Sequence, residues 1–416
     1  MHPTFIRLCA LAGACVVSMP LYAQETRASV SEAQSAAKTE QTADAPAVAQ
    51  KPGAFDRLVS LGTRVSGNAG GGNGVFPIFG GPVPGSGIAA GAGLRHSVGS
   101  GAVVDASMSL SLRGYAEAQA TIRSSSIEGR ASIAAQVIAQ DLRQLNYFGF
   151  GADSLKSDHS DYRLRRIGAL ALGNIRATRA LNLDWRAGYT EGRLLPGTSS
   201  VTPSVEQRFD AASAPGLDET MRYVHGDGAL NLDWRDHPGY PTQGGMLRAG
   251  LSRYQSLAVA AGSFSQLDVD TVHYLPIFRR NFDLIVRGRV TLARPDGGSQ
   301  VPFYMLPTLG GSETLRGFSD FRFRDTDAAV VNVEYRWPVF RMMDAALFAD
   351  GGRVASTPGG LLNSTLHRDY GMGVRLHTPT RAIARIDVAR GNEGIRLSVS
   401  LSAPFKSTHA VAPYVP

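Results

Sequence analysis

Apolar and polar residues alternate along most of the chain between residues 87 and 405. Because successive side chains of a β-strand point to opposite faces, a period of two predicts strands with one apolar face. The last segment shows the pattern most clearly, with every second residue apolar and the intervening residues polar. Its apolar positions are Ile395, Leu397, Val399, Leu401 and Ala403, and its polar positions are Arg396, Ser398, Ser400 and Ser402.

Fifteen alternating segments predict fifteen strands. They span 87–96, 102–112, 115–124, 129–141, 161–175, 180–190, 221–234, 245–254, 264–274, 281–293, 326–337, 343–351, 368–377, 382–390 and 395–404. Since single-chain bacterial barrels have an even number of strands, a sixteenth strand is expected. Residues 57–66 are the best candidate, and a split or misread segment is the alternative.

The connections between these strands form a short set and a long set. The short set is 236–244, 276–281, 338–342 and 378–381, and the long set is 191–220, 294–324 and 353–367. If both chain ends lie on the periplasmic side, the short connections all fall on that side and the long connections fall on the other. Such an asymmetry is typical of outer-membrane barrels, which have short periplasmic turns and long external loops.

A soluble β-sandwich also alternates, so the pattern alone does not predict a membrane protein. The segments have the length of about ten residues that a tilted membrane-spanning strand needs, and their polar faces carry many Arg and Asp residues. In lipid, only a closed barrel pairs every backbone group of such strands. We therefore predict an all-β fold, a transmembrane antiparallel β-barrel of sixteen strands over residues 55–405 with a tail at 406–416. The stretches 68–74 and 77–87 are rich in Gly and Pro and are predicted to be loops.

The first 23 residues read as a secretory signal peptide. Arg7 supplies a positive start, an apolar stretch follows, and Leu-Tyr-Ala at 21–23 fits the pattern of a cleavage site before Gln24. Lipidation at Cys15 is the alternative. Residues 24–54 contain few large apolar groups and predict a disordered linker. The expected location is the outer membrane of a Gram-negative bacterium.

Charge and cysteine content narrow the classes of partner. Charged residues make up 19% of the chain, and removing the signal peptide, which holds one arginine and no acid, lowers the formal charge from +7 to +6. That excess favours anionic partners such as lipopolysaccharide among the outer-membrane lipids, or else basic residues that line a lumen and its rims. No nucleic-acid partner is expected. Both cysteines, Cys9 and Cys15, lie in the signal peptide, so a mature chain has no thiol for a disulfide, a metal site or catalysis.

Two short motifs resemble those of a known family. Leu315-Arg316-Gly317-Phe318, at the end of a longer segment that starts at Leu309, resembles the V/L-R-G-F/Y motif of the BamA/TamA superfamily, the bacterial surface antigen barrels. Phe348-Ala349-Asp350-Gly351-Gly352 resembles the FxDxG motif of that superfamily, one hairpin downstream. Weaker matches lie at 147–151, 235–244 and 332–336. The last strand, with Leu401 and a terminal Phe405, resembles the signal by which the outer-membrane assembly machinery recognises and inserts its substrates.

The resemblance covers about residues 75–405 and implies a long external loop that folds back into the lumen. Arg316 would then meet Asp350, and Glu334, which also lies on a polar face, would share the contact. Gly317 is expected to permit a tight turn. The contact either holds the loop in register as a fixed latch or acts as a dynamic gate. The predicted latch residues are Leu315, Arg316, Gly317, Phe318, Glu334, Phe348, Asp350 and Gly352.

The sequence also departs from the family. Relatives that assemble or secrete proteins carry periplasmic POTRA domains before the barrel, and the residues ahead of the first predicted strand fit no such domain. The role of an insertase or secretion pore therefore does not carry over directly, although a separate periplasmic partner protein could supply the missing module. No patatin domain is expected either, because the chain has no GxSxG motif.

Chemistry beyond the barrel has few candidates. His225 lies near Asp227 on an inward face, and His159 lies near Asp158 and Asp161 in an acidic loop, so either histidine is part of a site or is a solvated lumen or loop residue. Without an organised nucleophile, no enzyme activity is expected, and no cofactor or metal. A set of arginines either binds anions or is offset by lumen acids such as Asp283: Arg163, Arg165, Arg166, Arg287 and Arg289.

Three functions follow from these observations. The first is an outer-membrane barrel of BamA/TamA type that acts in protein or lipid assembly, or in export, with a lateral seam between the first and last strands. The second is a plugged barrel that serves as surface antigen, anchor or small-solute pore. The third is an outer-membrane enzyme, which is the least expected.

Overall fold

The computed structural model describes residues 73–401 except 100, 125, 126, 128, 218, 258–261, 278–281, 379 and 380. The predictions made for the signal peptide at 1–23, the linker at 24–54, the strand at 57–66, Phe405 and the tail at 406–416 fall outside the described residues.

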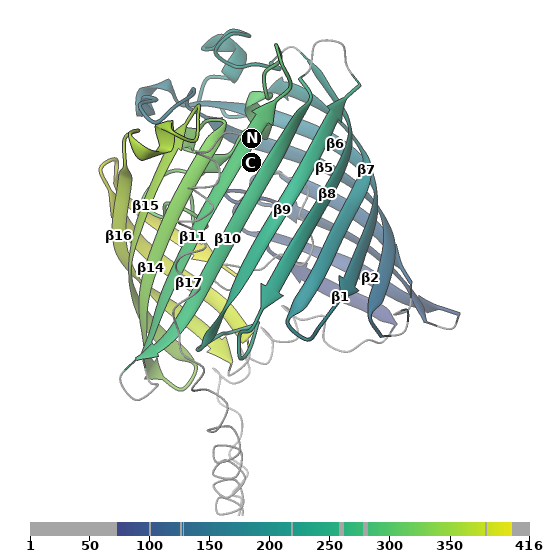
Figure 1. The fold of residues 1–416 in the computed structure, drawn as a ribbon. Helices are drawn as coiled ribbons and strands as arrows, with labels where there is room; N and C mark the ends of the chain where they lie inside the picture. The colour runs from purple at the N-terminus through teal and green to yellow at the C-terminus, as the bar shows by residue number, and fades with distance from the viewer. Residues whose placement is uncertain are drawn as a thin grey trace, which may run out of the picture. The chain divides into compact units, whose positions relative to one another are not determined.

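The described chain is one sixteen-stranded antiparallel sheet that curls into a barrel, with an additional two-stranded sheet, β12–β13, in the loop before β14 (Figure 1). Neighbours in the sheet are also neighbours in sequence, apart from that inserted loop. The strands are β1 Gly74–Phe79, β2 Ala89–Val98, β3 Ala102–Ser111, β4 Ala116–Arg123, β5 Ala131–Tyr147, β6 Ser160–Arg176, β7 Leu181–Pro196, β8 Thr220–Asp233, β9 Gly244–Ser256, β10 Phe264–Ile277, β11 Phe282–Pro295, β12 Thr308–Leu309, β13 Phe323–Arg324, β14 Asp327–Phe340, β15 Met343–Ala355, β16 His367–Thr378, β17 Arg381–Gly391 and β18 Gly394–Ser400. The predicted all-β barrel class is confirmed.

Among the described residues, helical structure is limited to single 3₁₀ turns. These turns are η1 Lys156–Asp158, η2 Val205–Gln207, η3 Phe303–Met305 and η4 Gly360–Leu362, all in the longer loops. In the part of the chain that the structure describes, no helix is long and apolar enough to cross a membrane.

All fifteen predicted strands are present, and the described residues supply one more strand to the sheet. This strand is β1, which overlaps the two Gly- and Pro-rich stretches, 68–74 and 77–87, that were predicted to be loops. Proline cannot donate a ladder hydrogen bond, so it is found mainly on edge strands, at strand ends and at bulges. β1 pairs on one side only, with Pro77 opposite Ala92 of β2. Two strand ends were also wrong: β5 and β7 were expected to stop at 141 and 190 but continue to Tyr147 and Pro196.

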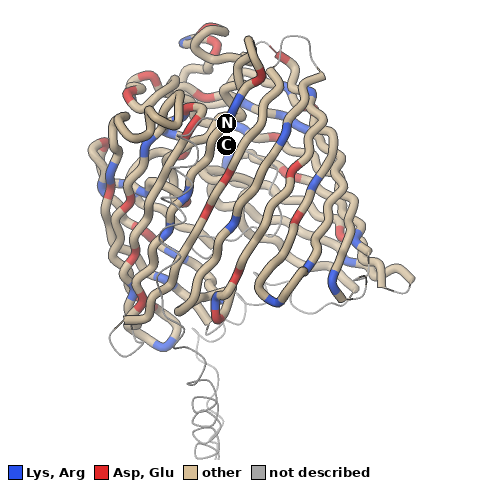
Figure 2. The backbone as a smooth tube through the Cα atoms, viewed as in Figure 1, with Lys and Arg blue, Asp and Glu red and all other residues tan. Residues whose placement is uncertain are grey.

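The alternation in sequence becomes an inner and an outer face. The outer face of β5, β6 and β8 exposes Val137, Ile167 and Leu230, which are 56%, 57% and 53% accessible. The inner face holds most of the charge, which Figure 2 shows distributed along the strands. Phe282 and Tyr335 stack on the outer face near the short turns, with ring centroids 5.9 Å apart, where an aromatic girdle is expected.

The loop between β11 and β14 lies inside the barrel. Its Phe303 and Tyr304 are buried in a cluster with Tyr147, Tyr162 and other inward residues of the wall. A second cluster packs the other end of the loop against β14 and β15: Ala152, Leu309, Leu315, Phe318, Phe323, Ala328, Val330 and Val354. The loop therefore has its own hydrophobic anchors at both ends.

Candidate functional site

Arg316 lies at the centre of the inserted loop and is 2% exposed. Its Nε and Nη2 each donate to a different oxygen of Asp350, both at 2.8 Å, and its Nη1 donates to Oε2 of Glu334 at 2.7 Å. Burial disfavours the charge of this guanidinium, but the hydrogen bonds to Asp350 and the charges of Asp350 and Glu334 outweigh it and raise the pKa of Arg316. One arginine thus bridges the inner faces of β14 and β15.

Glu334 extends the contact to β16 and β17. Its two carboxylate oxygens also accept from Nε and Nη2 of Arg375, at 3.0 and 2.7 Å, and Nη1 of Arg375 donates to Asp387 at 2.6 Å. A carboxylate can accept several hydrogen bonds, so one buried acid holds two arginines. We call Arg316, Glu334, Asp350, Arg375 and Asp387 the lumen network.

The backbone of the loop is held by wall residues as well. Asn332 donates to the carbonyl oxygen of Thr314 at 2.6 Å and to Oδ1 of Asp350 at 2.8 Å. Arg287 donates to the carbonyl oxygen of Glu313 at 2.7 Å, and Arg385 donates to that of Ser312 at 2.8 Å. Three wall strands, β11, β14 and β17, therefore fix three consecutive loop residues.

Apolar contacts complete the fit around the arginine. Leu315 is fully buried, and the Phe348 ring lies under the guanidinium of Arg316, with 3.5 Å between Cζ and the ring centroid. A cation over an aromatic face is favourable, more so when both are desolvated. Phe318 packs edge-on against His367 of β16, with centroids 5.8 Å apart. The structure thus brings together the loop motif and the wall motif that the sequence singled out.

The two motif glycines are required because a side chain at either position would collide with neighbouring atoms. A Cβ on Gly317 would lie 2.6 Å from Cβ of Asp369 and 2.8 Å from the backbone N of Gly391. A Cβ on Gly352 would lie 2.8 Å from Cδ1 of Leu309. Gly317 lies in a turn, as expected, and its φ is not positive, so close approach to the wall is what excludes a side chain there.

The same loop reaches the last strand. Nη2 of Arg396 in β18 donates to Asp320 at 2.6 Å, and its Nη1 donates to the carbonyl oxygen of Phe318 at 2.5 Å. Asp320 also lies against Gly85 in the β1–β2 loop, where an added Cβ would come within 2.8 Å of Oδ2. The loop therefore contacts the elements at both edges of the sheet.

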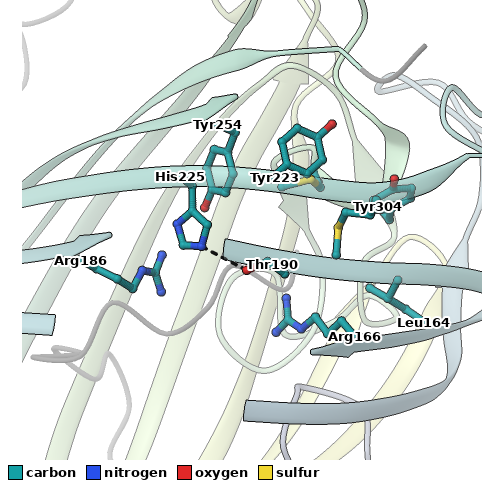
Figure 3. A pocket seen from close by; sticks show the side chains of 10 residues that line it. Leu164, Arg166, Arg186, Thr190, Tyr223, His225, Tyr254 and Tyr304 are labelled. Atoms are coloured by element: carbon teal, nitrogen blue, oxygen red, sulfur yellow. Dashed lines mark hydrogen bonds between the residues drawn. The ribbon is translucent and has the colours of Figure 1, made fainter. Parts of the chain in front are cut away.

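A second polar group surrounds His225 on the inner face of β7 and β8 (Figure 3). Thr190 Oγ1 lies 3.1 Å from Nε2 of His225, whose Nδ1 lies 3.1 Å from Oδ2 of Asp227, and Nε of Arg186 donates to the same Oδ2 at 2.8 Å. The order hydroxyl, imidazole, carboxylate is that of a nucleophile and its base. The cavity beside it, however, measures about 20 Å³ and has room for about one water molecule. We interpret the group as polar packing in the wall.

The histidine of the acidic loop is not part of a constellation. His159 stacks on Phe148 with centroids 4.7 Å apart and lies 3.0 Å from the side-chain oxygen of Asn146. Burial, assisted by the charges of Arg208 and Arg322, lowers its pKa. Asp161 faces elsewhere and accepts from the backbone N of Ser199 at 3.1 Å. Within the described ranges, no group of three or more His, Cys, Asp or Glu residues is arranged to hold a metal.

The inward arginines are offset by acids, but not by the predicted one. Arg287 pairs with Asp270 at 2.7 Å and Arg289 with Asp268 at 2.8 Å, whereas Asp283 pairs with Arg336 at 2.9 Å. Sequence reasoning also missed Arg375, Asp387, Arg385 and Asn332. The only signal for them was their place on polar faces, which many residues share.

Comparisons with known proteins come from a family model and from solved structures. A model of the Omp85 superfamily domain matches residues 99–402. The structure of BamA from Haemophilus ducreyi lacking POTRA domains 1–3 is similar with a TM-score of 0.58 and 14% identity, covering 78% of this chain and 69% of that chain. CdiB from Escherichia coli is similar with a TM-score of 0.50 and 11% identity, covering 78% of this chain and 61% of that chain. At these identities the likeness to the solved structures concerns the fold.

Proposed function

Because the chain belongs to the Omp85 superfamily of outer-membrane β-barrels, we propose that it acts in outer-membrane assembly or export through a seam between β1 and β18. The family membership confirms the resemblance drawn from the sequence. The family membership is shown, whereas an activity in assembly or export, and the passage of client polypeptides through this barrel, are proposed.

The observation that carries the proposal is the weakness of the two edge strands. β1 has 6 residues and β18 has 7, fewer than any other wall strand. Within residues 73–401, β1 pairs only with β2 and β18 only with β17. An unpaired edge offers backbone N–H and C=O groups to another strand, which is how a client polypeptide would be held during insertion. A separate periplasmic protein would deliver that client.

Site-specific photo-crosslinking tests the seam. Leu397 on β18 is 65% exposed and faces outward, and Leu230 on β8 is 53% exposed on the same outer face. A photoreactive residue at 397 is expected to capture unfolded outer-membrane polypeptide during assembly in cells, and the same residue at 230 is the matched control. Capture at both positions to the same extent, or at neither, would remove the seam from the proposal.

A plugged barrel without insertase activity is the second candidate. The lumen network and the loop backbone contacts favour it, because so many buried charged hydrogen bonds resist displacement of the loop. This candidate predicts that a photoreactive residue at 397 captures no unfolded polypeptide. It also predicts a low single-channel conductance that rises when the loop is released. We propose no enzymatic role, since the cavity beside the Thr190–His225–Asp227 arrangement is too small for a substrate.

A further inference from the structure

A group of arginines lies on the outer face of the barrel at the ends of β5–β8 that carry the long loops. We call it the outer rim cluster: Arg143, Arg163, Arg165, Arg193 and Arg222. The neighbouring inward residues Leu164, Arg166 and Met221 are buried, whereas Arg165, Arg193 and Arg222 are exposed. The cluster therefore faces the membrane side of the wall and not the lumen.

Strand register places the cluster in one patch. Arg165 lies opposite Asp141 on one side and Arg193 on the other, and Arg222 lies opposite Glu191. Adjacent strands are about 4.8 Å apart, so these side chains are neighbours across β5–β8. The patch joins four strands that are consecutive in the wall.

The patch has too few acids to neutralise it. Among the described residues of this face, the five arginines meet two carboxylates, Asp141 and Glu191, which leaves a formal excess of +3. Asp141 pairs with Arg163 at 2.5 Å and is 3.6 Å from both Arg143 and Arg165. Glu191 accepts from the hydroxyl of Tyr189 at 2.7 Å and is 3.6 Å from Arg222.

Two arginines elsewhere on the same rim are each matched by an acid. Arg253 pairs with Asp296 at 2.6 Å, and Arg294 pairs with Asp327 at 2.5 Å. At these positions on β9 and β11 the positive charge is therefore compensated, whereas β5–β8 carry a surplus.

The height of the patch fits a lipid headgroup. One or two outward positions toward the short turns, the wall becomes apolar, with Val137, Ile167 and Val224 exposed to 56%, 57% and 48%. The change from apolar to charged thus occurs at nearly the same level on three strands, as at the edge of the hydrocarbon layer. Acyl chains would lie on the apolar residues and the attached headgroup on the arginines.

We propose that the outer rim cluster binds lipopolysaccharide, the phosphorylated glycolipid of the external leaflet. Guanidinium groups bind phosphate with two parallel hydrogen bonds, and several arginines in one patch match several phosphates on one sugar headgroup. A zwitterionic phospholipid carries its own cation and leaves the surplus charge uncompensated. The inference rests on the outer-membrane placement, with the long loops external, but not on the handling of any client.

Binding by the purified full-length barrel in detergent tests the proposal. The ligands are lipopolysaccharide, the same lipopolysaccharide after phosphate removal, and inorganic pyrophosphate. The variant Arg165→Gln/Arg193→Gln/Arg222→Gln removes three charges from the cluster, and Arg253→Gln/Arg368→Gln/Arg390→Gln removes three from outward positions elsewhere on the rim. Heat-modifiable gel migration identifies folded protein in each sample, so only folded barrels are compared.

We expect lipopolysaccharide to bind the unmodified barrel, and binding to weaken about tenfold or more in the cluster variant, since charge-assisted hydrogen bonds to phosphate are lost. The control variant should change affinity by less than about threefold, because its arginines lie outside the site. Equal losses in both variants, or undiminished binding after phosphate removal, would overturn the proposal. Pyrophosphate that competes at the same concentration as the lipid would reduce the site to a free-phosphate site and would also overturn it.

Discussion

The two halves of the barrel wall differ in how far the lumen beside them is filled. On β14–β17 and the inserted loop, five arginines are among the largest fully buried side chains: Arg316, Arg324, Arg336, Arg375 and Arg385. On β2 and β3, the inward positions are small residues, among them Gly91, Gly93, Ser107 and Ser109, and a cavity of about 1310 Å³ lies against β2–β8. One half is filled by a charged loop, and the other leaves space.

This difference indicates in which half of the barrel buried ion pairs contribute to stability. Buried ion pairs cost desolvation energy and tolerate no missing partner, so the filled half should be sensitive to single substitutions. Glu117 and Thr190 on the emptier half are only partly buried and keep access to water, so substitutions of these two residues should be mild. The following experiments test that contrast. Unfolding in urea is monitored by the fluorescence of the three tryptophans, and release of the loop is measured by single-channel conductance.

The largest effect is expected for Glu334→Ala. It leaves Arg316 and Arg375 buried without a shared carboxylate, which costs about 3–5 kcal/mol of unfolding free energy. Glu117→Ala on β4 is the matched control: it removes an acceptor from Gln140 on the emptier half, for about 1 kcal/mol. Similar losses in the two variants would erase the distinction between the halves.

Arg316→Ala comes next, at about 3 kcal/mol, because Asp350 then lacks its bidentate partner. Releasing the loop should also raise the single-channel conductance several-fold, since the loop occupies the lumen. Arg316→Lys keeps the charge but not the planar fork, and so should recover only part of both effects. A conductance that is already large in the unmodified protein and does not respond to these variants would rule out an inserted plug.

Gly317→Ala should cost about 1–3 kcal/mol, the range for overpacking, because its Cβ meets Cβ of Asp369 and the backbone of Gly391. Gly226→Ala on β8 is the control, since an added Cβ there meets nothing within 4 Å. The control should be neutral within about 0.5 kcal/mol. If the two alanine variants unfold at the same urea concentration, the loop is not packed against the wall as described.

The smallest effect is expected for Thr190→Val on the emptier half. It removes the hydrogen bond between Thr190 and His225, worth about 1 kcal/mol, and changes little else. The assay is again urea unfolding, with His225→Gln as the companion variant. Additive losses from the two substitutions would argue against the direct contact, because residues in contact are expected to couple.

The fold was largely open to prediction from the sequence, and the site only in part. The motif pair and the alternation indicated that Arg316 and Asp350 would lie on facing surfaces, since Phe348 and Asp350 share one face of a strand. They gave no means of choosing Arg375 or Asp387 from the many polar residues on inner faces. Nor did they identify β1, where Pro77 suggested a loop until its edge position was known.

The alternation along each strand is enough to assign its residues to the inner or the outer face of the wall, because the side-chain period of a strand is two and needs no knowledge of neighbouring strands. The sequence also carried the family motifs. Which charges meet depends on the folded barrel, since partners such as Arg375 and Glu334 are 41 residues apart and are aligned by strand register. The path of the loop and the gathering of outward arginines on β5–β8 depend on the same long-range pairing, which no local pattern encodes.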